Sequence, residues 1–372
     1  MSQLTQKINE KLESSKTARR IRRHWLSIAF ISGFTTDILL LDKVDDLLDN
    51  LILLFYVVLS VVSILTLYAG LAEKLFNERI SYLAGTYSPL AIQYSFGGLL
   101  SGMLIFYGRS GDLIASWPFL VVLSAVILGN EVIRDRKKRL VFNLGCFFTG
   151  FLPYLVLVVS VFSGYMGVWV FVGSGLAALL FMYALVRVLA LIIPRFLAMQ
   201  MRVLVFTIGS IYVAFNGLYF LNIIPPIPLS LQEVGIYHGI VRFETGDYQV
   251  RYVSPSRWRF WQSSDPVLYG QTGASAVCFA RVFAPGQLST DIVHHWQYHD
   301  PAQRSWQTHA RVSYSIYGTG ERGYRGYSRI SNYHPGVWRC SVETERGQVL
   351  GREKFIIDNS TMPPREMVTE IR

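Results

Sequence analysis

The stretch IIPPIPLS (Ile223–Ser230) separates two parts of this chain that differ in character. Its prolines lack backbone donors and fix φ, so a helix that reaches this stretch ends there. The residues before it are almost continuously apolar, whereas those after it alternate β-branched and aromatic side chains with glycine, proline and serine. We therefore predict an α-helical membrane domain at residues 25–225, a stiff linker at 226–232 and an all-β domain at 233–358.

Composition and charge agree with this division. Of the 372 residues, 51% are hydrophobic and 16% charged, which is too apolar for an ordinary soluble protein. The net charge is +10, and basic residues cluster in KTARRIRRH (Lys16–His24) and RDRKKR (Arg134–Arg139), beside apolar segments. Such clusters are typical of anchors to anionic lipid, so we expect a lipid bilayer and no nucleic acid as partner. Residues 1–24 are predicted to be a cytoplasmic tail and residues 359–372 a flexible tail.

Seven segments are apolar over about 20 residues, the length that a helix needs to cross a bilayer. They are residues 25–41, 51–71, 89–107, 113–133, 140–162, 168–193 and 203–224. Basic loops, among them AEKLFNERIS (72–81) and PRFLAMQMR (194–202), alternate with acidic or neutral ones, and basic loops stay in the cytoplasm. The N-terminus is therefore predicted in the cytoplasm and the β domain on the opposite side of the membrane.

Polar residues inside these segments are candidates for function, because an ionisable group in hydrocarbon is costly unless it is paired. The candidates are Asp37, Gln93, Asn130, Glu131 and Arg187. Transport or lipid handling within the membrane domain is the alternative function that they suggest. Gly98 and Gly102 lie four residues apart, a spacing that allows two helices to approach closely.

The part after the linker consists of short runs with strand character, separated by turn residues. The runs are GIVRFE, YQVRYV, SAVCFARVF, DIVHHWQYH, WQTHARVSYSIYG, GYSRIS, VWRCSVET and QVLGREKFII. Short strands at near-regular spacing predict an antiparallel β-sandwich of the immunoglobulin or jelly-roll kind.

Three of these segments carry a family resemblance. VCFARVFAP, IVHHWQYH and HPGVWRCSVETERGQVLGREKFII resemble the family known as domain of unknown function 2914, and the apolar part resembles the membrane segment that accompanies it in bacteria. The residues that match are His294, Trp296, Gly336, Trp338, Gly347, Leu350 and Phe355. The resemblance implies a fold, a place in the inner membrane of a bacterium with the β domain in the periplasm, and no particular activity.

The run DIVHHWQYH is dense in histidine. Because side chains alternate along a strand, His294 and His295 are predicted to lie on opposite faces. A simple hairpin would place His294 opposite His309, although a slip by one residue would exchange the faces. Two facing histidines are too few for a metal site, so we expect no metal and no cofactor.

The cysteine and serine residues do not indicate a reactive site. Cys278 and Cys340 fall on predicted strands, and either a disulfide or two buried thiols fits the sequence. No serine lies in a G-x-S-x-G context, so enzyme activity is not expected.

A binding surface is the function that the sequence favours. Tyrosine and arginine are enriched in binding sites, and they gather with the conspicuous His and Trp residues of this domain. The candidates are His294, Trp296, His309, Tyr317, Arg322, Tyr324, Arg325, Tyr327, Arg329 and Trp338. We expect them to bind an envelope glycan or a protein partner without catalysis.

Overall fold

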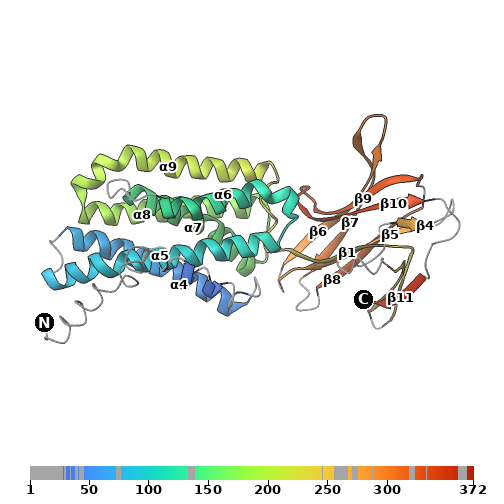
Figure 1. The fold of residues 1–372 in the computed structure, drawn as a ribbon, viewed down its shortest axis with the longest axis horizontal. Coiled ribbons are helices and arrows are strands. Elements are labelled where there is room, and N and C mark those ends of the chain that lie inside the picture. The colour runs from blue at the N-terminus through green and yellow to red at the C-terminus, as the bar shows by residue number, and fades with distance from the viewer. Residues whose placement is uncertain are drawn as a thin grey trace, which may run out of the picture. The chain divides into compact units, whose positions relative to one another are not determined.

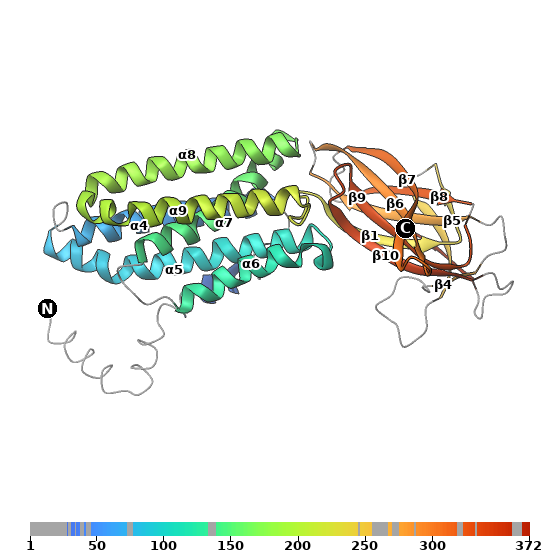
Figure 2. The same ribbon diagram turned by 90° about the horizontal axis from the view of Figure 1, so that it is seen from above.

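The computed structural model describes residues 28, 31–33, 35–37, 41, 46–72, 77–132, 139–244, 246–254, 267–269, 275–285, 288–317, 323–331, 333–358 and 367–372. The chain divides into two compact units, one built of helices and one that contains all the described strands. Figures 1 and 2 show these helices as a bundle and these strands as layered sheets. Each unit is considered by itself below.

Among the described residues, the helices are α4 (Leu47–Leu71), α5 (Glu78–Arg109), α6 (Leu113–Val132), α7 (Arg139–Ser163), α8 (Val168–Ile192) and α9 (Pro194–Phe220). Five of them, all except α6, are long and apolar enough to cross a membrane, which makes this a multi-pass membrane protein. Helix α6 has a shorter apolar section, Ile114–Val126. Most of the first predicted span, residues 25–41, lies outside the described residues.

Two predicted loops are partly or wholly helical. Residues 194–202 form the first turns of α9, and residues 78–81 open α5. Proline suits the first position of a helix, where its missing N–H has no partner to lose, so Pro194 starts α9 instead of breaking it. Pro89, which was predicted to begin a span, lies inside α5.

The strands are β1 (Ser230–Tyr237), β2 (Gly239–Arg242), β3 (Tyr248–Val253), β4 (Val267–Tyr269), β5 (Ala276–Phe283), β6 (Ser289–Asp300), β7 (Ser305–Tyr317), β8 (Tyr324–Ile330), β9 (Gly336–Thr344), β10 (Val349–Asp358) and β11 (Met367–Ile371). They form three sheets with the orders β1-β5-β8, β4-β10-β9-β6-β7 and β11-β3-β2. All the pairs are antiparallel except β4 with β10.

Strand β5 explains how the sheets are layered. Cys278 and Ala280 pack in clusters with β6 and β9, whereas Val277 and Phe279 pack with β2 and β3. Alternate residues of β5 thus enter two different cores, which is why SAVCFARVF is apolar on both faces. The predicted antiparallel sandwich is confirmed, and a third small sheet covers the middle one.

The C-terminal residues correct one prediction. Residues 367–371, predicted to be part of a flexible tail, form β11 and pair with β3 along Gln249–Val253. The described C-terminus is fixed further, because the backbones of Arg372 and Tyr248 exchange two hydrogen bonds of 2.8 and 3.1 Å. Strand β1 also begins at Ser230, inside the predicted linker.

Candidate functional site

The β6–β7 hairpin gives the five-stranded sheet two chemically different faces. As predicted, His294 and His295 lie on opposite faces, with Trp296 on the inner one. The predicted pairing is wrong, because His294 lies opposite Val312 and not His309. Trp296 pairs with Ala310 and Gln297 with Thr308, so His309 is an extra residue in a β-bulge.

The bulge also changes the direction of His309. Its ring lies 5.0 Å from that of Trp338, between centroids, and Trp338 is fully buried on the inner side. Beyond the bulge the residues of β7 alternate, so that Val312 and Tyr314 pack inward and Arg311 is exposed.

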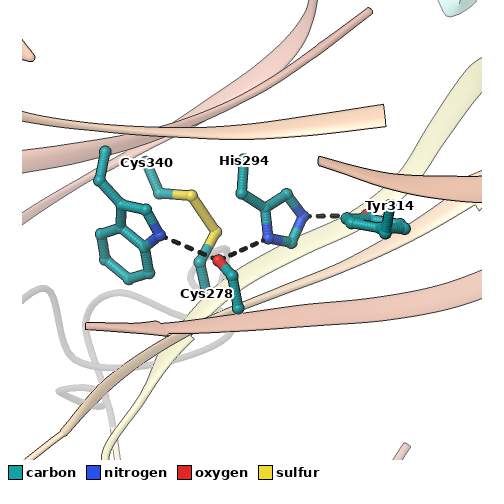
Figure 3. The surroundings of a disulfide bond; sticks show 6 residues. Cys278, His294, Tyr314 and Cys340 are labelled. Atoms are coloured by element: carbon teal, nitrogen blue, oxygen red, sulfur yellow. Dashed lines mark hydrogen bonds between the residues drawn. A yellow bond between two sulfur atoms is a disulfide. The ribbon is translucent and has the colours of Figure 1, made fainter. Parts of the chain in front are cut away.

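The inner face holds a buried polar cluster around His294. Its Nδ1 lies 2.9 Å from the Ser328 hydroxyl, which also accepts a hydrogen bond of 2.9 Å from Trp296 Nε1. Its Nε2 lies 3.0 Å from the Tyr314 hydroxyl (Figure 3). Burial lowers the pKa of His294 to about 3, so the imidazole is neutral at pH 7.

A disulfide lies beside this cluster. Cys278 of β5 and Cys340 of β9 are bonded, with Cα atoms 6.5 Å apart, and the bond joins the middle sheet to the five-stranded sheet (Figure 3). The sulfurs and a nitrogen of His294 lie within 4.8 Å of one another, a set of metal-ligand types that the sequence did not suggest. With the sulfurs bonded to each other and both imidazole nitrogens hydrogen-bonded, the cluster joins two sheets in the core.

The outer face carries a second and more accessible network. His295 Nδ1 lies 3.1 Å from Oε1 of Glu343, and its Nε2 lies 2.8 Å from Oγ1 of Thr308. Arg311 approaches the other oxygen of Glu343 at 3.8 Å. His295 and Glu343 are buried, whereas Thr308 and Arg311 are exposed, so the network reaches solvent at its Thr308 end.

The protons of this network determine what Thr308 offers to a ligand. Because Glu343 accepts from Nδ1–H, a neutral His295 accepts the Thr308 proton at Nε2 and leaves the hydroxyl oxygen free to accept. The network therefore presents the Thr308 oxygen as a hydrogen-bond acceptor at the edge of the outer face.

Trp306 forms the adjoining part of the outer face. The guanidinium carbon of Arg339 lies 4.2 Å from the centre of its ring, and Lys354 Nζ lies 5.9 Å from it. Arg339 Nε donates to the Gln297 side chain at 2.7 Å, which fixes the guanidinium over the indole. The ring of His299 contacts Trp306 edge to face, with centroids 5.3 Å apart. An aromatic ring with two cations and an amide is thus presented on one sheet surface.

The predicted arginines have other partners in the structure. Arg325 forms a 3.2 Å ion pair with Asp247 and donates to the Arg372 carbonyl at 2.7 Å. Arg329 donates to the Ile240 carbonyl at 2.6 Å. Both side chains tie β8 to the small third sheet, so they hold two sheets together. Arg322 lies outside the described residues.

The predicted aromatic residues are also dispersed. Tyr324 stacks on Tyr314, Tyr327 lies under the Arg329 guanidinium at 5.3 Å, and Trp338 is fully buried. Tyr317 is 66% exposed at the end of β7. The candidates that the sequence suggested therefore do not form one surface.

The polar residues predicted within the membrane segments also lie in different surroundings. Asp37 is fully buried, Gln93 is buried on α5, and Arg187 is exposed on α8 with its guanidinium 3.0 Å from the Tyr183 hydroxyl. Asn130 and Glu131 lie in α6, and their side chains are outside the described part.

Five residues of the outer face were not among the candidates predicted from the sequence: Trp306, Thr308, Arg339, Glu343 and Lys354. A signal was present, since polar and apolar residues alternate from Trp338 to Glu343 and from Ala310 to Val312. Its meaning depends on the strand order β7-β6-β9-β10, which brings these side chains together. Strand order is a long-range property that no single run carries.

Comparisons with known proteins bear on this region. A search of curated proteins finds no match. A solved structure that matches is the Pseudomonas fluorescens alkylpurine DNA glycosylase AlkC bound to DNA containing an abasic site analog, with 10% identity over 85% of this chain and 99% of that one, and a TM-score of 0.19. A likeness that weak carries no argument. Residues 289–357, which span β6 to β9 and nearly all of β10 and include every residue of the outer-face network, match the family described as a protein of unknown function, DUF2914.

Proposed function

We propose that this multi-pass membrane protein presents its β domain in the periplasm of a bacterium, where the outer face of the five-stranded sheet binds an anionic glycan of the cell envelope. The arrangement of Trp306, Arg339 and Gln297 carries the proposal. An aromatic ring packs against the apolar face of a sugar, while guanidinium and amide groups bind carboxylates and hydroxyls.

Charge supports an acidic ligand over a neutral one. Arg311, Arg339 and Lys354 lie on this face around the single buried carboxylate of Glu343, within the part of the sheet that the structure describes. Glu343 is already engaged by His295 and Arg311, so the remaining cations are available to a ligand. Thr308 adds a hydroxyl at the edge of the same patch.

The compartment is supported by two independent features. The alternation of basic and non-basic loops predicts an outside position for the β domain. The Cys278–Cys340 disulfide is of the kind that persists in oxidising compartments.

Binding without catalysis fits the position of the Thr308–His295–Glu343 network. Its geometry resembles that of a nucleophile, a base and an orienting acid. Thr308 is exposed on a strand, however, whereas a hydroxyl activated for transfer chemistry works best where water is excluded.

Titration calorimetry on the full chain in detergent tests the proposal. An oligomer of galacturonic acid is the probe, and an oligomer of galactose is its neutral counterpart. We expect the acidic oligomer to bind, and Trp306→Ala or Arg339→Ala to weaken binding at least tenfold, or about 1.4 kcal/mol. Affinity should fall as salt is added, because Arg311 and Lys354 are exposed.

Tyr317→Ala is the matched control, since Tyr317 is an exposed aromatic residue on the same strand as Trp306 and lies away from the cluster. It should bind like the wild type. Equal binding by Trp306→Ala and wild-type protein would rule out the outer face as the site.

A further inference from the structure

The helical unit contains a buried carboxyl group, Asp37, whose described partners are two hydroxyls and the backbone N–H of Gly102. Its Oδ1 accepts a 2.8 Å hydrogen bond from Tyr56, and its Oδ2 accepts one of 2.6 Å from Ser101. Its side chain has no exposed surface, and it has no ion pair with any residue that the structure describes. A carboxylate held in an apolar bundle without a cation is costly, so a bound proton stabilises it.

Ser101 can accommodate both protonation states of Asp37. Its hydroxyl lies 2.6 Å from Oδ2 of Asp37 and 3.0 Å from the Gly98 carbonyl. When Asp37 is ionised, Ser101 donates to the carboxylate. When Asp37 is protonated, it donates to Ser101, which then donates to Gly98. Turning one hydroxyl thus moves the site between its two states without moving a helix.

Gly98 and Gly102 of α5 make room for this arrangement. A Cβ at Gly98 would overlap the ring of Tyr56, and a Cβ at Gly102 would lie 2.6 Å from Leu53 and 3.3 Å from Asp37 Oδ2. The close approach of α5 to α4 that their spacing predicted therefore brings Tyr56 to Asp37.

Further hydroxyl pairs continue along the same interface of α4 and α5. Ser60 donates to Ser95 at 2.8 Å, and the hydroxyls of Thr66 and Ser88 lie 2.9 Å apart. Tyr56, Ser60 and Thr66 follow one face of α4, at steps of about 6 and 9 Å along the axis. A hydrogen-bonded chain across gaps of that size requires one or two bridging water molecules.

Buried polar groups also mark the start of α4. Asp49 and Asn50 are each 4% exposed, and from Asp49 to Thr66 the face is about 26 Å long, close to the thickness of the hydrocarbon core. Leu53, which follows Asp49 and Asn50 on α4, is also fully buried. We call the row Asp49, Asn50, Asp37, Tyr56, Ser101, Ser60, Ser95, Thr66 and Ser88 the α4–α5 polar seam.

We propose that Asp37 binds and releases protons and that the α4–α5 polar seam conducts them through the helical unit. An O–H bond of hydronium breaks as one forms on the Asp37 carboxylate, and the reverse transfer to water follows on the other side, so no oxidant or reductant is needed. The other titratable groups around it are Tyr56, Asp49, whose charge acts on Asp37, and Tyr94, whose ring lies 5.7 Å from that of Tyr56.

Proton flux into liposomes tests this activity. The full chain is reconstituted with a pH-sensitive dye inside, and a pH jump is applied outside while valinomycin and potassium balance the charge. We expect wild-type protein to acidify the lumen faster than empty liposomes do. Asp37→Asn should reduce the flux at least tenfold, and Ser60→Ala should reduce it less, since water can replace a hydroxyl.

Ser174→Ala on α8 is the matched control, because Ser174 is a buried serine outside the seam and should keep wild-type flux. If Asp37→Asn does not fold, Ser101→Ala provides the test, and infrared difference spectra of wild-type protein between pH 5 and 9 report the protonation of a buried carboxyl directly. Wild-type flux equal to that of empty liposomes, or unchanged flux in Asp37→Asn or in a folded Ser101→Ala protein, would overturn the proposal.

Discussion

His294 is a histidine that the folded domain keeps uncharged. Its pKa is lowered by burial from 6.5 to about 3, so between these values the unfolded chain binds a proton that the folded chain does not. The free energy of unfolding therefore falls as pH decreases from about 7 to about 4, by on the order of 3 kcal/mol from this group.

His294→Asn should remove this contribution. The variant is expected to be less stable at pH 7, because it loses contacts with Ser328 and Tyr314, but its stability should change less between pH 7 and pH 4. Guanidinium titrations followed by tryptophan fluorescence measure how the free energy of unfolding changes with pH in the wild type and in the variant. His309→Asn, in the same hairpin but exposed, is the control, and an equally steep slope for the His294 variant would contradict the assignment.

Glu353 changes the pH dependence of the free energy of unfolding in the opposite direction. Burial raises its pKa from 4.5 to about 7, so the folded chain holds a proton that the unfolded chain has released, and stability from this group is lost as pH rises through 7. Glu353→Gln should be about 1–2 kcal/mol more stable than wild type at pH 8, less than the full shift because the side chain keeps some exposure. The gain should vanish at pH 4, and the same guanidinium titration detects either result.

At the scale of elements, β5 is the strand on which the sandwich depends. It pairs with β1 and β8, supplies residues to two cores, and is bonded to β9 through Cys278 and Cys340. The bond closes a loop with a sequence separation of 62 residues, which restricts the unfolded chain and stabilises the fold by about 4 kcal/mol.

Replacing both cysteines by alanine should therefore lower the stability of the β domain by about 4 kcal/mol while the strands still form at low temperature. Denaturation of the full chain in detergent, followed by tryptophan fluorescence, measures the change. Cys146→Ala, which removes the free cysteine in α7, is the control and should leave this transition in place. A double variant as stable as wild type would show that the bond adds nothing to the fold.

At the scale of the whole molecule, the loops predict on which side of the membrane each part lies. Alkaline phosphatase, which is active outside the cytoplasm, should be active when fused after Arg372 and inactive when fused within residues 133–138, between α6 and α7. Activity of the second fusion and inactivity of the first would reverse the orientation and remove the periplasmic ligand from the proposed function.

The division into apolar helices and a β-sandwich was predictable because it rests on local patterns, namely long apolar runs and alternation with a period of two. The same patterns predicted that His294 and His295 point to opposite faces. They did not predict the bulge at His309, because the register of a hairpin depends on the fit of its whole inner face.

The candidate site shows the same limit. Tyr324, Arg325 and Arg329 were identified by residue type, yet they pack against β7 or hold β8 to another sheet. Trp306 and Arg339 come from strands that are separated in sequence and meet only across β6. Residue type indicates what a side chain can do, and the partner that it finds depends on strand order.

The sequence by itself determined the class of this protein, its apolar spans and the alternation of its strands, since each follows from the chemistry of neighbouring residues. Only the tertiary structure decided that β5 is covered on both faces, that residues 367–371 complete a third sheet, and that Asp37 meets Tyr56 and Ser101. These contacts join residues distant along the chain, and their free energy comes from burial and hydrogen bonds that exist only once the elements have packed.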